Sequence, residues 1–339
     1  MRRRLRRRRN LGWHPVWIGA VVIVLQLLGA AAVQGIGTEE KEAGEPLKTH
    51  PEIVKNIYEE SRDEFRGFPE IQQVVSSTFP EDIRDQYPLE ALQDFERLKG
   101  MYLYDPEYIV PYPELLDVDA FMEWDLNLDS AVNGPQILIF HTHGSEYYAD
   151  TGPGGVIQVG EYLAQLLEEE YGLQVMHDIS IYDQDAQVSA YDLMRENVGR
   201  ILDENPSIQV TIDLHRDGVG GDGRLVSNID GQDVAQLMCV TGISSEYNWE
   251  TGMMEETSYL YNPYRTANLA FSFRTKMAAD VMYPGLMRNM YLSTYRYSTY
   301  MREKGMLLEV GAQGNTLEEC YRAMEYFAPV LMQILNGKG

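Results

Sequence analysis

The fold is decided by the stretch QILIFHTHGSEYY at residues 136–148. Its apolar run, residues 137–140, is followed at once by the polar residues 141–146. A short apolar run that ends in polar residues is typical of a strand buried on both faces, as in a parallel sheet. Ligands of open α/β sheets bind outside the carboxyl ends of such strands. The sequence therefore places these polar residues where a ligand site is expected.

Two of these polar residues have the spacing of metal ligands. His143 and Glu146 form a His-x-x-Glu pattern, and one turn of chain lets an imidazole nitrogen and a carboxylate oxygen reach one divalent ion. Zinc accepts both ligand types. His141 competes with His143 for the metal, and the glutamate three residues after His143 favours His143. The stretch is interpreted as half of a zinc site.

Strands and helices alternate along the rest of the chain. Strands are expected at residues 173–176, 208–214, 234–240 and 306–310, and helices near residues 159–167, 191–202, 262–282 and 317–331. Gly172 is expected to end the first helix, and Thr316 with Glu319 to form a capping box for the last one. Alternation of this kind predicts right-handed βαβ crossovers. We expect an α/β domain over residues 131–339, with a mostly parallel open sheet and helices on both faces.

Two later strands supply the rest of the expected site. His215 follows the apolar run IQVTIDL, and Glu309 lies inside MLLEV, where a charge is costly unless it is paired or functional. Two histidines and one glutamate, with a water, make a catalytic zinc site. We expect His143, Glu146 and His215 to bind Zn2+. Glu309 is the expected catalytic acid–base, which takes a proton from the water and returns it to a leaving nitrogen.

Bound zinc lowers the pKa of water to about 7 and polarises a carbonyl, so an amide can be cleaved without a covalent intermediate. Asp213 is expected to orient a ligand histidine. Arg216 is the best cation for a substrate carboxylate, although a salt bridge to Asp217 or Asp213 is the plainer interpretation. His177 is interpreted as structural. Four tyrosines near the last strand either line a groove for sugar or peptide or pack across strands. They are residues 291, 295, 297 and 300.

The N-terminus carries a membrane signal. Seven arginines at positions 2–4 and 6–9 precede an apolar run over residues 17–33. Positive charge stays on the cytoplasmic side, which predicts a single-pass signal anchor in residues 1–35, with the body extracytoplasmic at the cell membrane. The run is short for a spanning helix and contains Gln26, so a secretory signal cleaved near residues 30–32 is the alternative. Either way, the body works on the outer face of a membrane.

Residues 36–130 are expected to be a linker and a helical membrane-proximal region. Residues 36–48 are charged and poor in apolar residues, as in linkers. Short helical patterns over residues 52–97 are interrupted by prolines, and residues 104–130 begin rich in Pro, Tyr and acids. The region shows no chemistry of its own. A docking surface for another extracytoplasmic protein is the alternative to a plain arm.

Charge and cysteine content exclude some classes of protein. The chain has 28 basic and 52 acidic residues; without the seven N-terminal arginines the body keeps 21 basic residues, a formal balance of −31. Such a body repels nucleic acid, so DNA or RNA binding is not expected. Two cysteines, Cys239 and Cys320, form either one disulfide or two buried thiols. A cysteine-based metal motif is not indicated.

Four separated motifs resemble one known family. LIFHTHGSEYY, TIDLHRDG, NPYRTANLAFSFRTKMAADVMYPGLMR and MLLEVGAQGNTLEE, in this order over residues 136–335, resemble the stage II sporulation protein P family. The resemblance implies a zinc N-acetylmuramoyl-L-alanine amidase of peptidoglycan. It would cleave between the lactyl group of muramic acid and L-alanine, and would also act as an endopeptidase on peptide cross-links.

The resemblance also implies a setting and site residues. The family is anchored in the membrane, works during engulfment in endospore-forming bacteria, and acts with stage II sporulation proteins D and M. The matching motifs carry metal and catalytic roles onto His143, His215 and Glu309, and less directly onto Glu146. The chain departs from the family where members read Tyr-Asn-Gln, because it has Tyr-Ser-Thr at residues 297–299. Specificity or rate would differ if that asparagine contacts substrate.

Two other functions fit parts of the pattern. A zinc peptidase of the carboxypeptidase type shares His-x-x-Glu, a later His and a late Glu, and would release single C-terminal residues from a plain peptide. A non-catalytic wall-binding or scaffold protein would have a structural histidine cluster and no zinc. The acidic body is awkward for an anionic wall polymer, and a locally basic cleft near Arg216 would offset it.

Overall fold

A computed structural model describes residues 92–185, 187–220 and 222–336 of the chain. The expected membrane span at residues 17–33, the linker and most of the membrane-proximal region lie outside the described residues. Within the described ranges, no helix is both long enough and apolar enough to cross a bilayer.

The centre of the described body is a seven-stranded sheet with strand order β1-β10-β7-β11-β4-β2-β3. The strands are β1 (Tyr102–Leu103), β10 (Met290–Ser293), β7 (Leu237–Gly242), β11 (Lys304–Ala312), β4 (Val210–Asp217), β2 (Ile137–Phe140) and β3 (Val175–His177). Every neighbouring pair is parallel except β7 and β11. The expected mostly parallel α/β sheet is therefore confirmed, with one antiparallel junction.

The junction follows from how the chain enters β7. After β4 the chain forms a hairpin of β5 (Val226–Ile229) and β6 (Gln232–Ala235) and passes directly into β7, with no helix between. A parallel return needs a crossover that carries the chain back to the other edge of the sheet. Without a crossover, β7 starts at the same end of the sheet at which β4 finishes, and it is antiparallel to its neighbour β11. The single strand expected at residues 234–240 is thus divided between β6 and β7.

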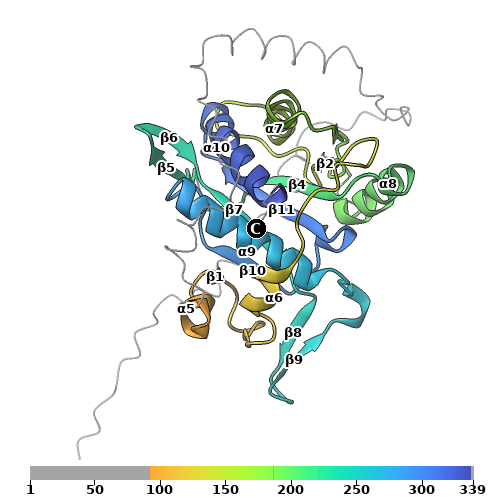
Figure 1. Ribbon diagram of the computed structural model, residues 1–339, viewed down its shortest axis with the longest axis vertical. Coiled ribbons are helices and arrows are strands. Elements are labelled where there is room, and N and C mark those ends of the chain that lie inside the picture. Colours follow the sequence, from red (N-terminus) through yellow and green to blue (C-terminus); the bar gives the residue numbers. More distant parts are fainter. Residues whose placement is uncertain (1–91, 186, 221, 337–339) are drawn as a thin grey trace, which may run out of the picture. The chain divides into compact units, whose positions relative to one another are not determined.

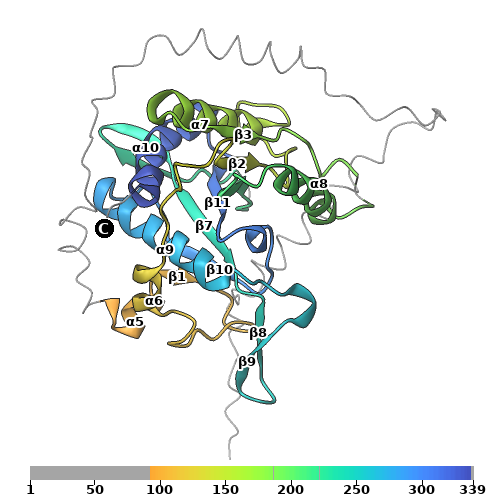
Figure 2. The ribbon, with the colours of Figure 1, turned by 45° about the vertical axis from the view of Figure 1, so that its right-hand side comes forward.

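Helices cover the two faces of the sheet unequally (Figures 1 and 2). Helices α7 (Gly155–Tyr171), α9 (Arg265–Met282) and α10 (Leu317–Leu335) lie together on one face, and α8 (Ala190–Glu204) lies on the other. Leu138 and Phe140 of β2 pack against Met194 and Val198 of α8. On the opposite face, Thr241 of β7 hydrogen-bonds a serine of α9. Helix α8 therefore covers the β2 half of its face only.

The segment before β2 also belongs to this body. It contains α5 (Phe95–Lys99), the edge strand β1 and α6 (Val118–Glu123). Phe121 of α6 stacks on Phe273 of α9 with ring centroids 5.5 Å apart, and the Leu128 amide donates to the Leu335 carbonyl at 2.8 Å. A second hairpin, β8 (Ser245–Asn248) and β9 (Met253–Glu256), extends from the sheet (Figure 1).

Local signals in the sequence specify two helix ends. Gly172 follows α7 with φ 66°, a left-handed conformation that glycine adopts without steric cost. Thr316 and Glu319 form the expected capping box at the start of α10. Cys239 and Cys320 are both buried free thiols rather than a disulfide.

Candidate functional site

Three strand ends bring the expected site residues to one edge of the sheet. Glu309 of β11 is the register partner of His215 of β4, so both side chains project from the same face. The loop after β2 carries His143, whose ring centroid lies 5.5 Å from that of His215. Glu146 of the same loop has Oε2 3.6 Å from His215 Nδ1. The structure thus places His143, Glu146, His215 and Glu309 next to one another.

Hydrogen bonds hold the loop after β2 in place. The backbone amide and hydroxyl of Thr142 donate to Asp213 at 2.9 and 2.7 Å. The amide and hydroxyl of Ser145 donate to Asp183 at 3.1 and 2.5 Å. Buried donors and acceptors that are paired in this way fix a backbone. The loop is therefore anchored to β4 on one side and to the segment after β3 on the other.

His215 is buried between two carboxylates. Its Nε2 lies 2.7 Å from Asp213 Oδ1, and its Nδ1 faces Glu146. Burial opposes a charge on the imidazole, but the carboxylates of Asp213 and Glu146 outweigh it and raise the pKa of His215 well above its ordinary value. Burial would raise the pKa of Asp213, yet its bonds from His215 and Thr142 lower it. Asp213 therefore stays ionised and orients the ring, as the sequence predicts.

Glu146 and Arg216 are connected through the backbone. The Arg216 amide donates to Glu146 Oε2 at 3.1 Å. The Arg216 guanidinium donates to the carbonyls of Tyr147 and Asp217 and lies over the Tyr147 ring, 5.6 Å from its centroid. The Asp217 carboxylate pairs instead with Arg288 at 2.5 Å. Arg216 thus lies at the exposed rim of the site, beside an aromatic ring.

Glu309 is the most unusual group at the site. Its side chain is half-buried, and its Oε2 is enclosed without a hydrogen-bond partner among the described residues. The pKa of Glu309 is raised to about 8, mainly by burial and also by the nearby Asp217 and Glu146, while His215 and Arg288 oppose the rise. An enclosed acceptor without a donor costs free energy. Perturbed carboxyls of this kind cluster at functional sites.

The donor set suits zinc in its chemistry. Two ligand atoms of a tetrahedral zinc lie roughly 3.3 Å apart at bond lengths of about 2.0–2.1 Å, close to the 3.6 Å between Glu146 Oε2 and His215 Nδ1. His143 Nδ1 is turned toward Asp183, 3.5 Å from its Oδ2. In the ranges that the structure describes, no three His, Cys, Asp or Glu side chains converge closely enough, as they stand, to hold an ion. The distance between Glu146 and His215 is thus compatible with two ligands of one ion, and His143 lies beside them.

His141 lies outside this cluster, and its two ring nitrogens contact other groups. Nδ1 lies 2.9 Å from the Leu214 carbonyl oxygen, and Nε2 lies 2.8 Å from His177 Nε2. His177 Nδ1 in turn lies 2.8 Å from Glu161. Burial and His177 lower the pKa of His141 to about 3, so its ring stays neutral. Gly160 leaves room for this pair, because a Cβ there would lie 2.6 Å from the His141 ring.

Two neighbours of the site and one neighbour of the His141–His177 pair were not expected from the sequence. Asp183 binds the loop after β2, Glu161 of α7 holds His177, and Tyr191 of α8 packs edge-on against the His143 ring at 5.6 Å. Asp183 lies in an irregular segment without a motif. Tyr191 was expected only as part of the apolar face of a helix. Nothing in their local sequence separates them from ordinary surface or core residues.

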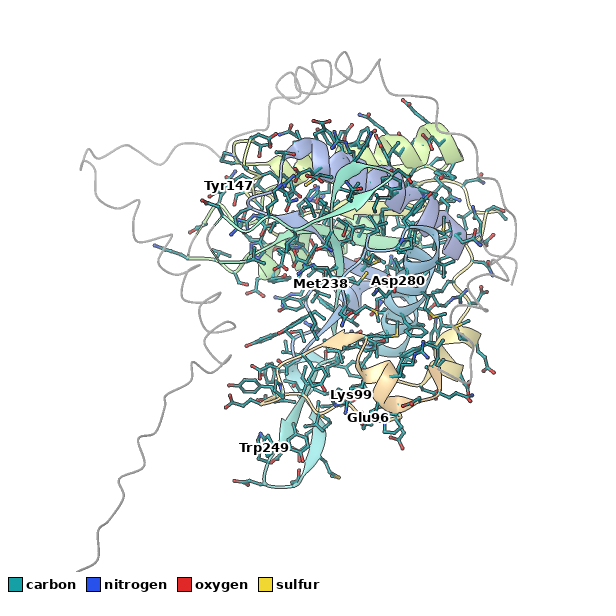
Figure 3. The ribbon with its side chains drawn as sticks, turned by 90° about the vertical axis from the view of Figure 1, so that its left-hand side faces the viewer. Glu96, Lys99, Tyr147, Met238, Trp249 and Asp280 are labelled. Carbon is teal, nitrogen blue, oxygen red and sulfur yellow. The ribbon has the colours of Figure 1, made fainter. Side chains whose placement is uncertain are left out.

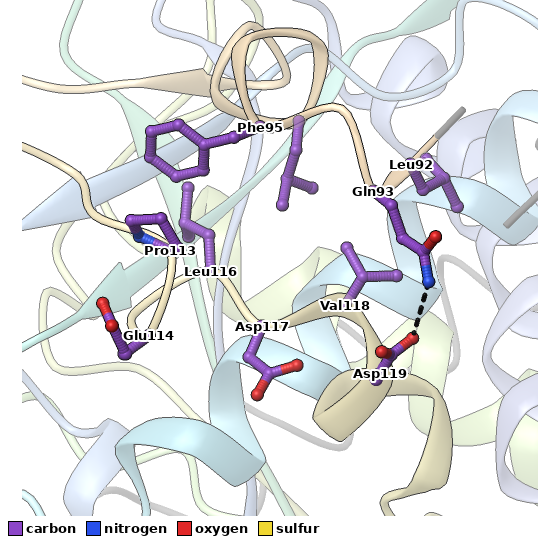
Figure 4. A pocket seen from close by; sticks show the side chains of 10 residues that line it. Leu92, Gln93, Phe95, Pro113, Glu114, Leu116, Asp117, Val118 and Asp119 are labelled. Carbon is purple, nitrogen blue, oxygen red and sulfur yellow. Dashed lines mark hydrogen bonds between the residues drawn. The ribbon is translucent and has the colours of Figure 1, made fainter. Parts of the chain in front are cut away.

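A cavity lies away from these strand ends, between α5 and α6 (Figure 4). Its volume is about 290 Å³, and Leu92, Phe95, Leu116 and Val118 are among the residues that line it. Its polar lining consists of Gln93 and acidic side chains, and Gln93 hydrogen-bonds Asp119 at 3.4 Å. It contains none of the expected site residues.

A family model describes the same chain. The model of the stage II sporulation protein P family matches residues 40–332. The chain belongs to this family. The match begins well before residue 136, so residues 40–135 are also covered by the family model. No curated protein sequence is significantly similar to the chain.

Some solved structures are similar to this stage II sporulation protein P. An N-acetylmuramoyl-L-alanine amidase from Clostridium difficile is 11% identical with a TM-score of 0.38, over 61% of this chain and 100% of that one. The amidase AmiC2 of Nostoc punctiforme is 13% identical with a TM-score of 0.34, over 60% and 98%. Ami1 from Mycobacterium abscessus is 10% identical with a TM-score of 0.37, over 60% and 97%. TM-scores this low do not establish a shared fold.

Proposed function

We propose that this protein is a zinc-dependent peptidoglycan hydrolase, an N-acetylmuramoyl-L-alanine amidase that remodels the septal wall during sporulation engulfment. Family membership over residues 40–332 supports the setting. The observation that carries the chemistry is Oε2 of Glu309, which is enclosed without a hydrogen-bond partner in the described part of the chain and belongs to the register partner of His215. A general base must lie within hydrogen-bond reach of the water that it deprotonates, and Glu309 lies beside the proposed metal ligands.

His143, Glu146 and His215 would hold the zinc, which when bound polarises the amide carbonyl and makes water more acidic. Asp213 keeps the His215 ring in one orientation through its 2.7 Å contact with Nε2, which leaves Nδ1 for the metal. The Arg216 amide holds Glu146 Oε2 in the same way. These contacts position the ligands before substrate arrives.

Glu309 moves the proton. It accepts a proton from the attacking water and delivers it to the leaving nitrogen of L-alanine. A pKa near the working pH is the most effective for a group that must both accept and donate, and burial raises the pKa of Glu309 toward that range. The cation would lower that pKa, so that the carboxylate form predominates when the site is loaded.

The setting is part of the proposal. Residues 1–35 would anchor the protein in the cell membrane with its body extracytoplasmic, and stage II sporulation proteins D and M would act beside it. Arg216, at the rim of the site, would pair with a carboxylate of the stem peptide. Endopeptidase cleavage of cross-links would use the same metal and the same Glu309.

The products of digestion test the reaction. Purified protein is incubated with peptidoglycan sacculi, and fragments are identified by mass spectrometry. Glycan strands that have lost the whole stem peptide, with new L-alanine amino termini, are expected. Release of single C-terminal residues would assign the protein to the carboxypeptidase class instead. Absence of any fragment, together with less than one zinc per protein, would contradict the proposal.

A further inference from the structure

A line of aromatic rings connects the site to solvent. The His143 ring packs against Tyr191 at 5.6 Å, Tyr191 lies 5.5 Å from Tyr297, and Tyr297 lies 6.1 Å from Tyr295, measured between ring centroids. The side chain at the far end, Tyr295, is 55% exposed. We call Tyr191, Tyr297 and Tyr295 the ring line. It begins at a proposed metal ligand and ends at the surface.

The loop that carries two of these rings is held firmly. Tyr297 has φ 46°, a left-handed conformation that is uncommon for a bulky residue and persists only where its surroundings impose it. The loop rests on Gly242, where a Cβ would collide with the Tyr295 carbonyl oxygen. The Ile243 amide donates to the Ser293 carbonyl at 2.8 Å. Strain that is maintained in this way is typical of residues placed for a ligand.

The ring line crosses the part of the sheet face that α8 leaves uncovered. Met238, Val240 and Leu307 form an apolar cluster there, on the face opposite α9, and Tyr297 packs on it. Figure 3 shows Met238 between Tyr147, near the site, and Trp249 on the β8–β9 hairpin. The line therefore extends from the edge where β4 and β11 carry the site toward the opposite edge, where β7 and β10 end.

The ring line is uncharged in a protein of formal charge −24. The neighbouring cation, Arg296, is turned away: it stacks on Tyr300 at 3.7 Å and donates to the Tyr261 carbonyl. Arg216 and Arg288 are bound at Tyr147 and Asp217 instead. A ligand of this surface is therefore neutral, has flat apolar faces, and is long enough to pass from ring to ring.

We propose that the ring line is a subsite for the glycan strand of peptidoglycan on one side of the cleaved residue. This inference rests on the proposed function and names what lies beside the reacting amide. Sugar rings present apolar C–H faces to aromatic side chains, and the glycan backbone has no charge where its lactyl groups are amide-linked. A stem peptide carries carboxylates, which the acidic body repels. We therefore assign the stem peptide to the side of the site that carries Arg216.

Oligomers of N-acetylglucosamine test the subsite, because they lack both the lactyl group and the peptide. We expect chitotetraose to bind the full-length protein in a calorimetric or NMR titration, and Tyr295→Ala to weaken binding by about five- to tenfold, the loss of one ring contact. Tyr326→Ala is the matched control. Its ring stacks on Tyr283 at 4.8 Å among the helices of the other face, and binding should not change.

Three results would overturn the subsite: no binding of chitotetraose, an equal loss in Tyr326→Ala, or displacement of the oligosaccharide by free stem peptide. Kinetics separate this inference from the reaction itself. Tyr295→Ala should raise KM for long glycan strands more than for a single muramoyl peptide, the pattern of lost ground-state binding. Equal KM changes for both substrates, with hydrolysis retained, would contradict the subsite and leave the amidase proposal intact. Oligosaccharide binding that depends on Tyr295, without any hydrolysis, would support the subsite and contradict the amidase proposal.

Discussion

Glu309 and His215 occupy the same register position on adjacent parallel strands, β11 and β4. Parallel neighbours carry paired side chains on one face at about the strand spacing of 4.7–4.9 Å. A residue from the last strand of the chain is thereby placed next to one from its middle without any loop to position it. The proposed base and a proposed ligand are consequently held by backbone hydrogen bonds of the sheet.

Glu309→Gln should remove hydrolysis and leave metal binding. The amide keeps the shape of the side chain but cannot accept the proton, and general base catalysis typically contributes about 10²–10⁴-fold. The rate of muropeptide release should fall by that factor, while zinc measured by atomic absorption stays at one per protein. Glu303→Gln, in an exposed position of the preceding loop, is the control. A Glu309→Gln enzyme that retains most of its activity would exclude this base.

The metal-free protein should lose stability with rising pH because of Glu309. Its folded pKa of about 8 lies above the unfolded value of about 4.3. The folded state therefore binds more protons between these values, and stability that is present below pH 4 is lost as the pH rises through 8. With a chelator present, the free energy of unfolding of Glu309→Gln should exceed that of the wild type by roughly 1–3 kcal/mol at pH 9. At pH 4 the two free energies should be the same. Urea unfolding across this range measures the difference; a constant difference would contradict the raised pKa.

Asp213→Asn should weaken zinc binding. Asp213 accepts two hydrogen bonds from Thr142 and contacts His215 Nε2. The asparagine amide keeps the shape of the side chain but removes the negative charge that orients the His215 ring. Loss of such a partner typically lowers metal affinity by about 10–100-fold. Competition with a chromogenic chelator gives the affinity directly. An unchanged affinity would mean that His215 is oriented by the backbone alone.

Gly160→Ala should destabilise the protein, whereas Gly199→Ala should not. A Cβ at Gly160 would lie 2.6 Å from the His141 ring, while the space around Gly199 is open. Overpacking of a filled interior typically costs about 1–3 kcal/mol, and alanine in an open helical position gains about 0.5–1 kcal/mol. Thermal unfolding of the two variants should therefore shift in opposite directions. Equal shifts would show that the His141–His177 contact is loose.

The sequence predicts the parts of this site that depend on single strands. An apolar run that ends in a polar residue specifies where His143, His215 and Glu309 lie, because the carboxyl ends of parallel strands share an edge. The role of His141 could not be predicted from the sequence. Its partner His177 is set by the pairing of β2 with β3, where Ile139 is opposite His177, and register between distant segments leaves no local signal. A strand was expected at residues 234–240, but the reversed direction of β7 was not, since a hairpin replaced the expected crossover.

Because β7 and β10 run opposite to β11 and β4, the loops that follow these two pairs of strands lie at opposite ends of the sheet. The loops that follow β2 and β4, with the end of β11, carry the proposed metal ligands and the proposed base, whereas the loop that follows β10 carries the proposed glycan subsite. We therefore expect substitutions in residues 294–298 to change the preferred length of the glycan strand and to leave the cleaved bond the same. Adaptation to a different wall polymer would then require changes only at this end of the sheet, away from the proposed cation site.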